Sequence, residues 1–286
     1  MNRLGIHALV WAGDTSTASV EHAVAGTVAA GYELLEFSLH DTEHFDTAHA
    51  RRVTEEAGLQ VVCSRGLAAG ADVSSDDPGV VARGADLLAE SIRVTAELGG
   101  TLLTGALYSA FGKFPRPISA AGRANAVSAL RDAAAEASRR GITLGLEVCN
   151  RYETNVINTA TQALELADDV GADNVVIHLD TYHMNIEESD FRRPVHDTGE
   201  RLGYVHIGEN HRGYLGSGHL PFPDFFHALV DSGYTGAITF ESFSSAIGER
   251  PLLYDLAIWR DLWDDGADLA AHARRFIADG MAAARS

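Results

Sequence analysis

Short apolar runs alternate with longer amphipathic segments along the whole chain, and the alternation occurs eight times. Apolar runs of about four to eight residues bounded by Gly, Asn or Asp are typical of buried parallel strands. The predicted strands cover residues 4–11, 33–39, 59–64, 101–107, 142–148, 174–179, 203–207 and 237–240. The predicted helices cover residues 18–30, 47–57, 80–98, 118–139, 160–170, 190–201 and 224–232, and two more helical segments are expected after Pro251.

This order predicts an α/β fold, a single (β/α)₈ TIM barrel with extra C-terminal helices. No linker or low-complexity tract divides the chain, so one domain over residues 1–286, with a helical extension over about 252–286, is favoured over two doubly wound domains. The chain lacks the two sequence motifs that are typical of nucleotide binding. No GxGxxG follows the first strand, and no GxxxxGK precedes a Ser or Thr.

Residues with metal-binding chemistry stand at the ends of four predicted strands. Glu147 ends LGLE, and Asp180 follows VVIHL. His206 lies in GYVHI, and Glu241 follows GAITF. A buried carboxylate is costly, and the carboxyl ends of barrel strands meet at one face where active sites lie. We interpret the four as one metal site, although each alone could equally be a helix cap or an ion-pair partner.

Three carboxylates and one imidazole form a mostly oxygen ligand set, which suits Mn²⁺, Mg²⁺ or Co²⁺ better than a structural zinc. Such a site leaves positions open for two adjacent substrate oxygens, such as the carbonyl and hydroxyl of an α-hydroxy ketone. Binding them polarises the carbonyl, so the neighbouring C–H is easier to deprotonate. If Glu147 and Glu241 stand on opposite faces of the substrate, one removes the proton and the other returns it, which inverts a stereocentre.

The composition limits the classes of partner. A net charge of −18 with a single lysine repels phosphate backbones and anionic lipid, so neither nucleic acid nor a membrane is expected. No run is long enough to cross a membrane, and the first residues do not resemble a signal peptide. Cys63 and Cys149 lie in apolar runs, which indicates no disulfide framework and fits a reducing cytoplasm.

Longer stretches around these residues resemble the ketose 3-epimerases of the xylose-isomerase-like barrel superfamily, which act on D-tagatose, D-allulose (psicose) or L-ribulose. The matching stretches are LEVCNRYETNVINT, HLDTYHMNIEE, YVHIGENHRGYLGSGHL and ITFESFSS. Three others, DVSSDDPGVVARG, LYSAFGK and IWRDLW, extend the resemblance over nearly the whole chain, toward the allulose and ribulose branch.

The resemblance implies epimerisation of free ketoses at C3 through a metal-bound cis-enediolate. It implies Mn²⁺ as the usual metal, with Co²⁺ or Mg²⁺ as alternatives, and metal ligands at Glu147, Asp180, His206 and Glu241. The acid/base pair falls on Glu147 and Glu241. The resemblance also implies a homodimer or homotetramer, and the tail aromatics at 259 and 263 are expected to cover the barrel or a partner subunit.

The residues that the resemblance assigns to substrate binding are Glu153, His183 and Arg212. Position alone slightly favours a surface loop histidine at His183, and it does not exclude a solvated loop position for Arg212. The chain departs from the family pattern at His7, where other members carry an aromatic. His7 is therefore a candidate substrate contact, and the preferred ketose stays open.

Three other activities remain as alternatives. Aldose–ketose isomerases of the same superfamily use a similar metal site to move a carbonyl between C1 and C2. An endonuclease-like phosphodiesterase on this barrel would need two or three metals, more histidine ligands and a basic groove, which the charge disfavours. A catalytically dead sugar-binding protein would not need both Glu147 and Glu241.

Overall fold

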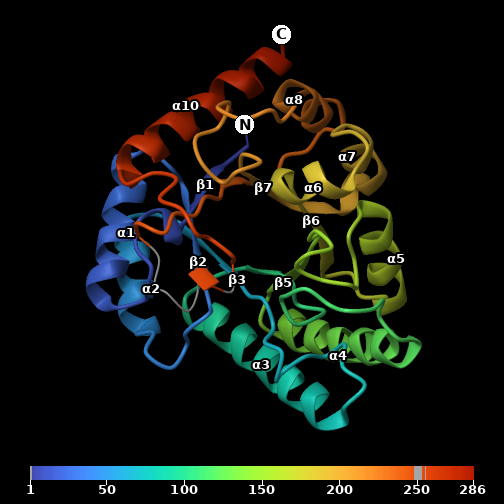
Figure 1. Ribbon diagram of the computed structural model, residues 1–286. Helices are drawn as coiled ribbons and strands as arrows, with labels where there is room; N and C mark the ends of the chain where they lie inside the picture. The colour runs from blue at the N-terminus through green and yellow to red at the C-terminus, as the bar shows by residue number, and fades with distance from the viewer. Residues whose placement is uncertain (1, 248–252, 255) are drawn as a thin grey trace.

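Eight parallel strands close into a barrel in sequence order, as a computed structural model of residues 2–247, 253–254 and 256–286 shows (Figure 1). The barrel closes where β1 pairs with β8, at Leu4 opposite Ile238. The strands are β1 (Leu4–His7), β2 (Leu34–Ser38), β3 (Gln60–Ser64), β4 (Leu102–Gly105), β5 (Thr143–Glu147), β6 (Val175–Asp180), β7 (Leu202–Ile207) and β8 (Ile238–Phe240). The predicted (β/α)₈ architecture is confirmed.

The helices form a ring around the barrel (Figure 1). They are α1 (Thr17–Ala29), α2 (Thr47–Glu56), α3 (Pro78–Glu97), α4 (Ala120–Arg139), α5 (Ala160–Val170), α6 (Thr181–Glu187), α7 (Arg193–Thr198), α8 (Phe222–Asp231) and α10 (Gly266–Ala284), with 3-10 turns η1 (Ala8–Val10) and η2 (Gly199–Arg201). Short polar side chains accept backbone N–H groups where seven of these helices begin, so local sequence fixes where they start. These caps are Ser16, Asp46, Asp77, Ser119, Thr159, Asp180 and Asp265.

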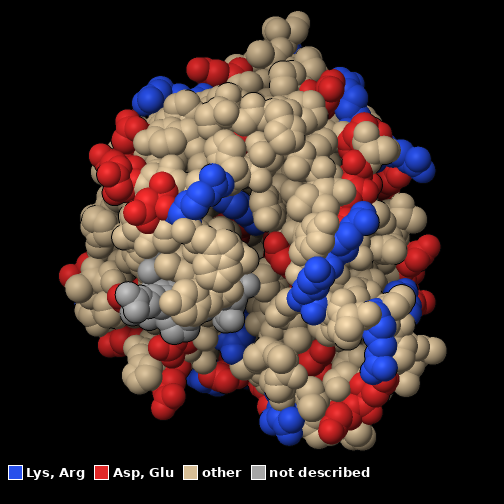
Figure 2. Space-filling model, viewed as in Figure 1, with Lys and Arg blue, Asp and Glu red and all other residues tan. Residues whose placement is uncertain are grey.

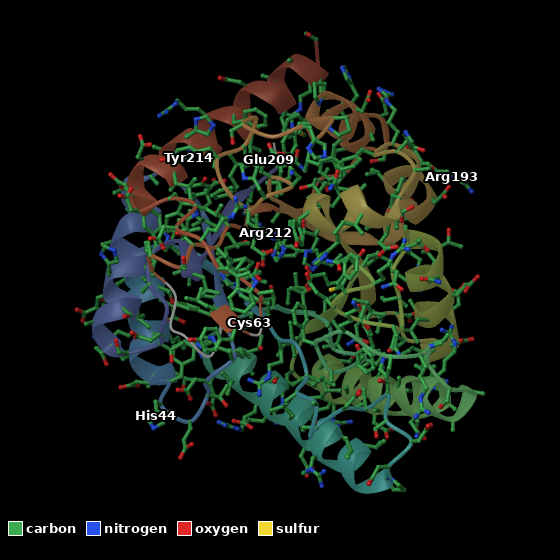
Figure 3. The ribbon with its side chains drawn as sticks, in the orientation of Figure 1. His44, Cys63, Arg193, Glu209, Arg212 and Tyr214 are labelled. Carbon is green, nitrogen blue, oxygen red and sulfur yellow. The ribbon has the colours of Figure 1, made fainter. Side chains whose placement is uncertain are left out.

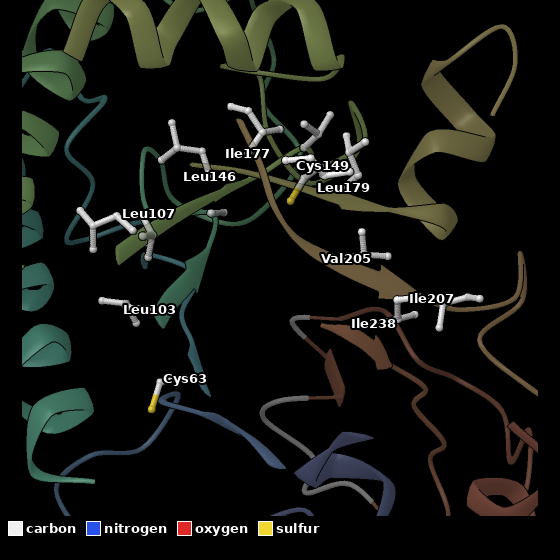
Figure 4. Close-up of a cluster of buried hydrophobic side chains, with 14 of the residues drawn as sticks. Cys63, Leu103, Leu107, Leu146, Cys149, Ile177, Leu179, Val205, Ile207 and Ile238 are labelled. Carbon is white, nitrogen blue, oxygen red and sulfur yellow. The ribbon is translucent and has the colours of Figure 1, made fainter. Parts of the chain in front are cut away.

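Two faces of each strand have different roles. On β2, Leu35 and Phe37 are buried in the large core between strands and helices, part of which Figure 4 shows. Glu36 lies between them and points to the barrel interior, where it contacts residues of β7. This period of two follows from strand geometry, and it lets the outer face be apolar while the inner face carries polar groups.

Some element boundaries differ from the predictions. The first strand ends at His7, because its side chain accepts the N–H of Leu9 and begins η1. The helix predicted over 190–201 consists of α7 and η2, and α6 precedes it as an unpredicted helix directly after β6. Of the two helical segments expected after Pro251, the structure describes α10. The other falls partly on residues 252 and 255, outside the described residues.

The C-terminal segment packs on the barrel. α10 contacts α8, and the rings of Phe276 and Phe222 meet edge to face with centroids 5.1 Å apart. Trp263 is buried and donates its Nε1–H to Oγ of Ser242 at 2.7 Å. Trp259, in contrast, is 68% exposed. Of the two tail tryptophans, therefore, only Trp263 covers the barrel.

Acidic side chains are spread over the face seen in Figure 2, with basic side chains scattered among them. This distribution matches the net charge of −18. Within the described part of the chain, no helix combines the length and apolar character needed to cross a membrane.

Candidate metal and active site

The four predicted metal ligands converge at the carboxyl ends of β5 to β8. β5 ends at Glu147 and β6 at Asp180. β7 carries His206, and Glu241 directly follows β8. One potential ligand atom from each residue lies within 4.8 Å of those from the other three. The fold thus brings together residues that are far apart in sequence.

His206 presents its Nδ1 atom to this cluster. Its Nε2 lies 2.7 Å from Oε2 of Glu36, so Nε2 carries the proton and donates it to the carboxylate. Nδ1 is buried without a hydrogen-bond partner, 3.4 Å from Oε1 of Glu241 and 3.7 Å from Oε1 of Glu147. A histidine with one nitrogen fixed as a donor and the other buried beside carboxylates without a hydrogen bond is suited to bind a metal ion.

Glu36 is itself held in place by hydroxyl groups. Its Oε2 also accepts the hydroxyl of Tyr204 at 2.7 Å, and that hydroxyl lies 2.6 Å from Oγ1 of Thr239. Burial raises the pKa of Glu36, but the charge and hydrogen bond of His206 outweigh burial and lower it to about 2. Glu36 is therefore an ionised acceptor that fixes the tautomer of His206.

The two carboxylate oxygens of Asp180 have different roles: one caps a helix, and the other faces the site. Oδ1 accepts the N–H of Tyr182 at 2.7 Å and caps α6. Oδ2 is buried 3.1 Å from Nη2 of Arg212, yet it makes no hydrogen bond. A divalent cation among the four residues would satisfy both this oxygen and Nδ1 of His206. The donor set therefore fits an oxygen-rich cation site.

Glu147 and Glu241 are ionised at neutral pH. Burial raises the pKa of both, but the surrounding imidazoles, His178 foremost, hold the pKa of Glu147 well below its usual value. At Glu241, Arg212 and His206 outweigh burial and lower the pKa. Nη1 of Arg212 lies 2.6 Å from Oε2 of Glu241. Both carboxylates can therefore bind a cation or accept a proton.

Arg212 is a buried residue of the site and not a solvated loop residue. Its guanidinium lies 4.0 Å from the ring centroid of Tyr182 and points toward the barrel mouth (Figure 3). Its backbone has a φ of 61°, which is uncommon for a residue with a side chain. The buried Glu209 steadies the same loop, since its Oε2 accepts the N–H of Gly216 at 2.8 Å. This loop conformation is what turns Arg212 inward.

His183 lies on α6 and is 2% exposed, so it is not a surface loop histidine. Its Nδ1 accepts the backbone N–H of Asn150 at 3.2 Å, which leaves Nε2 as the donor. Nε2 is 3.6 Å from Oε1 of Glu147 and 3.7 Å from Oε2 of Glu153. The side chain of Asn150 donates to Oε1 of Glu153 at 2.8 Å and so links the two predicted substrate-binding residues.

A cavity of about 370 Å³ opens over these residues. All of the predicted site residues except Asp180 line it: His7, Glu147, Glu153, His183, His206, Arg212 and Glu241. His7 is buried on the side opposite Glu147, with Nε2 3.4 Å from Oγ of Ser64 and 3.6 Å from Oε1 of Glu36. Burial lowers the pKa of His7, and its Nδ1 accepts the N–H of Leu9, so a neutral ring presents an N–H.

Comparison with known proteins agrees with this geometry. Residues 24–277 match the model of the xylose isomerase-like TIM barrel family. An L-ribulose 3-epimerase from Methylomonas sp. (strain DH-1) is 48% identical over 273 residues, which cover 96% of each chain. A ketose 3-epimerase from Arthrobacter globiformis is 48% identical over 284 residues, which cover 99% of this chain and 98% of the relative. The chain belongs to the ketose 3-epimerase family of xylose isomerase-like TIM barrels.

A solved structure within the ketose 3-epimerase family is also close in shape. The crystal structure of D-allulose 3-epimerase from Methylomonas sp. in complex with D-allulose has a TM-score of 0.95 and 47% identity, and the match covers 97% of this chain and 96% of that one. The overall barrel fold is therefore common to this chain and to that enzyme.

The sequence predictions assigned no role to the residues beneath the ligands. Glu36 stands in the otherwise mostly apolar strand LLEFS, and a single acid at such a position is the signal that could have identified it. Tyr204 and Thr239 gave no such signal, because both are common in strands. Their roles follow only from the register that places β2, β7 and β8 around one interior.

We expect Glu36→Gln to lower the affinity for Mn²⁺ about 10- to 100-fold, the usual effect of removing a carboxylate behind a metal-binding histidine. A neutral amide can donate to Nε2 or accept from it, so it no longer fixes the tautomer of His206. Calorimetric titration of chelator-treated protein measures the change. Glu33→Gln, at an exposed position just before β2, is the matched control and should bind as the wild type does. Wild-type affinity in Glu36→Gln would contradict the role of Glu36.

Proposed function

We propose that the protein is a metal-dependent ketose 3-epimerase that inverts C3 of free ketoses of the D-fructose/D-allulose, D-tagatose/D-sorbose or L-ribulose/L-xylulose type. The observation that carries the proposal is the pair of ionised glutamates, Glu147 and Glu241, on strands β5 and β8 beside the unpartnered Nδ1 of His206. The names of relatives 48% identical to this chain support the same reaction.

Glu147, Asp180, His206 and Glu241 are the residues that would hold the cation, and we propose Mn²⁺, with Co²⁺ or Mg²⁺ as substitutes. A divalent cation at this position supplies polarisation of the substrate carbonyl, which acidifies the C–H at C3. The ring of His206 would bind the cation through Nδ1, because Nε2 is hydrogen-bonded to Glu36. Arg212 keeps Glu241 ionised and oriented through the 2.6 Å contact with its Oε2.

In the proposed mechanism the two glutamates divide the proton transfers. One carboxylate accepts the proton from C3, and the carbon becomes planar. The other carboxylate takes up a proton from water, becomes the acid and delivers that proton to the opposite face, which inverts the configuration at C3. Water then accepts the proton left on the first carboxylate. We propose that Nε2–H of His183, the guanidinium of Arg212, Glu153 and Nε2–H of His7 orient the sugar hydroxyls. All four line the cavity and present polar atoms to it.

We expect D-fructose incubated with the Mn²⁺-loaded protein to yield D-allulose. Chromatography of the products measures this. An aldose product would instead favour the alternative, an aldose–ketose isomerase on the same barrel. Exhaustive chelation should abolish conversion, and Mn²⁺ or Co²⁺ should restore it better than Zn²⁺ because the ligands are mostly oxygens. Full conversion by a sample verified to be free of metal would contradict the metal-dependent reaction.

We expect Glu147→Gln and Glu241→Gln each to reduce kcat at least ~10²-fold, the scale of a positioned proton-transfer group. Gln keeps one oxygen ligand but cannot take the proton, so metal content should be measured in each variant. Solvent deuterium separates the roles, because a variant that lost only the reprotonating carboxylate still exchanges the C3 hydrogen without inversion. Glu165→Gln, on the exposed side of α5, is the control and should epimerise normally. Near-normal rates in either site variant with metal bound would contradict the two-base mechanism.

We also propose a homo-oligomer in a reducing cytoplasm. The exposed rings of Tyr254 and Trp259 lie 5.9 Å apart, and exposed aromatic pairs are typical of protein contacts. Cys63 and Cys149 are free and buried. Light scattering at micromolar concentration tests the assembly, where we expect at least a dimer and where a monomer would contradict it.

A further inference from the structure

The cavity extends beyond the metal-binding residues to the other half of the barrel mouth. Its chemistry is concentrated at the ends of β5 to β8, which carry Glu147, His206 and Glu241. The ends of β1 to β4 contribute a different wall that includes Ser38, Arg65 and the loop after β3. A sugar held at the metal by its carbonyl end would therefore extend toward this wall.

Arg65, the residue after β3, is the notable group of this wall. It is half-buried, and its Nε and Nη1 atoms are fully buried without any hydrogen-bond partner. Among the described residues that line the cavity, the other Lys or Arg is Arg212. Arg212 lies 3.1 Å from Asp180 and 2.6 Å from Glu241, whereas Arg65 has no carboxylate within 4.0 Å among the described residues.

The position of Arg65 is set by the backbone. Its N–H donates to the carbonyl of Thr104 at 2.9 Å. Gly105 packs against it so closely that a Cβ there would lie 2.3 Å from the carbonyl oxygen of Arg65. Gly105 also has a φ of 114°, which a side chain rarely allows. The barrel thus holds the start of this side chain firmly at the cavity wall.

An unpaired cation in such a place is unfavourable. Burial lowers the pKa of Arg65, and the charge of Glu90 on α3 only partly offsets this. Buried guanidinium nitrogens without acceptors cost free energy, and a charged acceptor relieves more of that cost than a neutral one does. A sugar hydroxyl would fill one hydrogen bond but would leave the charge unpaired, so an oxyanion is the better complement.

We propose that Arg65 forms an anion-binding subsite for substrates that carry a phosphate ester or a carboxylate at the end of the ketose remote from the carbonyl. The inference rests on the proposed function for the direction in which the sugar lies. Both groups offer the same chemistry, a charged oxygen acceptor, and differ in size and charge. The chain then handles neutral ketoses and anionic ketoses in one cavity, with the reacting carbon at the metal in both cases.

The test compares D-fructose with its 6-phosphate and with the corresponding ketohexuronate, using the Mn²⁺-loaded protein. We expect at least one anionic ketose to have a lower KM, or a lower inhibition constant against D-fructose, than the neutral sugar has. In Arg65→Gln, the ratio of kcat/KM for the anionic ketose to that for D-fructose should fall about tenfold or more. Lys113→Gln removes the same unit charge from an exposed position outside the cavity and should leave the ratio unchanged.

Each outcome decides the proposal. Preference for the phosphate or for the carboxylate identifies which group the subsite takes. If D-fructose is epimerised but neither anionic ketose binds more tightly, or if Arg65→Gln leaves the ratio unchanged, the subsite is wrong while the proposed function stands. If no ketose is converted, the proposed function fails, and direct calorimetric titration with the 6-phosphate still decides whether Arg65 binds an anion. Loss of that binding in Arg65→Gln alone would support the subsite.

Discussion

The structure depends on offsetting the repulsion among three carboxylates that point into one buried space. Glu147, Asp180 and Glu241 would repel one another strongly in a low-dielectric interior. Arg212 contacts Asp180 and Glu241, and His206 faces Glu147 and Glu241, so positive and polar groups are interleaved with the acids. An oxygen of Asp180 and a nitrogen of His206 are among the buried atoms left without a hydrogen-bond partner. The cluster is therefore preorganised for a cation, and its protein ligands need little rearrangement.

The (β/α)₈ barrel makes this arrangement possible at modest cost. Its strands direct polar side chains into the barrel around the site, and their apolar outer faces pack against the surrounding helices. The interior also accommodates a supporting layer, in which Glu36 holds His206 and Tyr204 holds Glu36. In the proposed function, the half built on β5 to β8 carries the chemistry, and the half built on β1 to β4 meets the remainder of the ligand. Different loops would perform these two tasks, so the tasks could change independently.

Much of this could be predicted from the sequence, for identifiable reasons. Strands and helices alternate clearly, so the barrel and the meeting of Glu147, Asp180, His206 and Glu241 followed from topology alone. Position could not decide whether His183 and Arg212 were buried, because their burial depends on an unpredicted helix and on a left-handed backbone at residue 212. The tautomer of His206 and the isolation of Arg65 depend on contacts between strands, which no local pattern encodes.

The hydrogen bond from Trp263 to Ser242 has a consequence for how the molecule is made. Ser242 follows Glu241 and donates to the backbone carbonyl of Arg212, so the tail tryptophan supports two site residues at once. Neither β8 nor Trp263 can take its place before the first seven strands have been synthesised. A nascent chain that ends before β8 therefore carries Glu147, Asp180 and His206 without Glu241 and without the supporting tryptophan. The site is completed only when the barrel closes between its first and last strands.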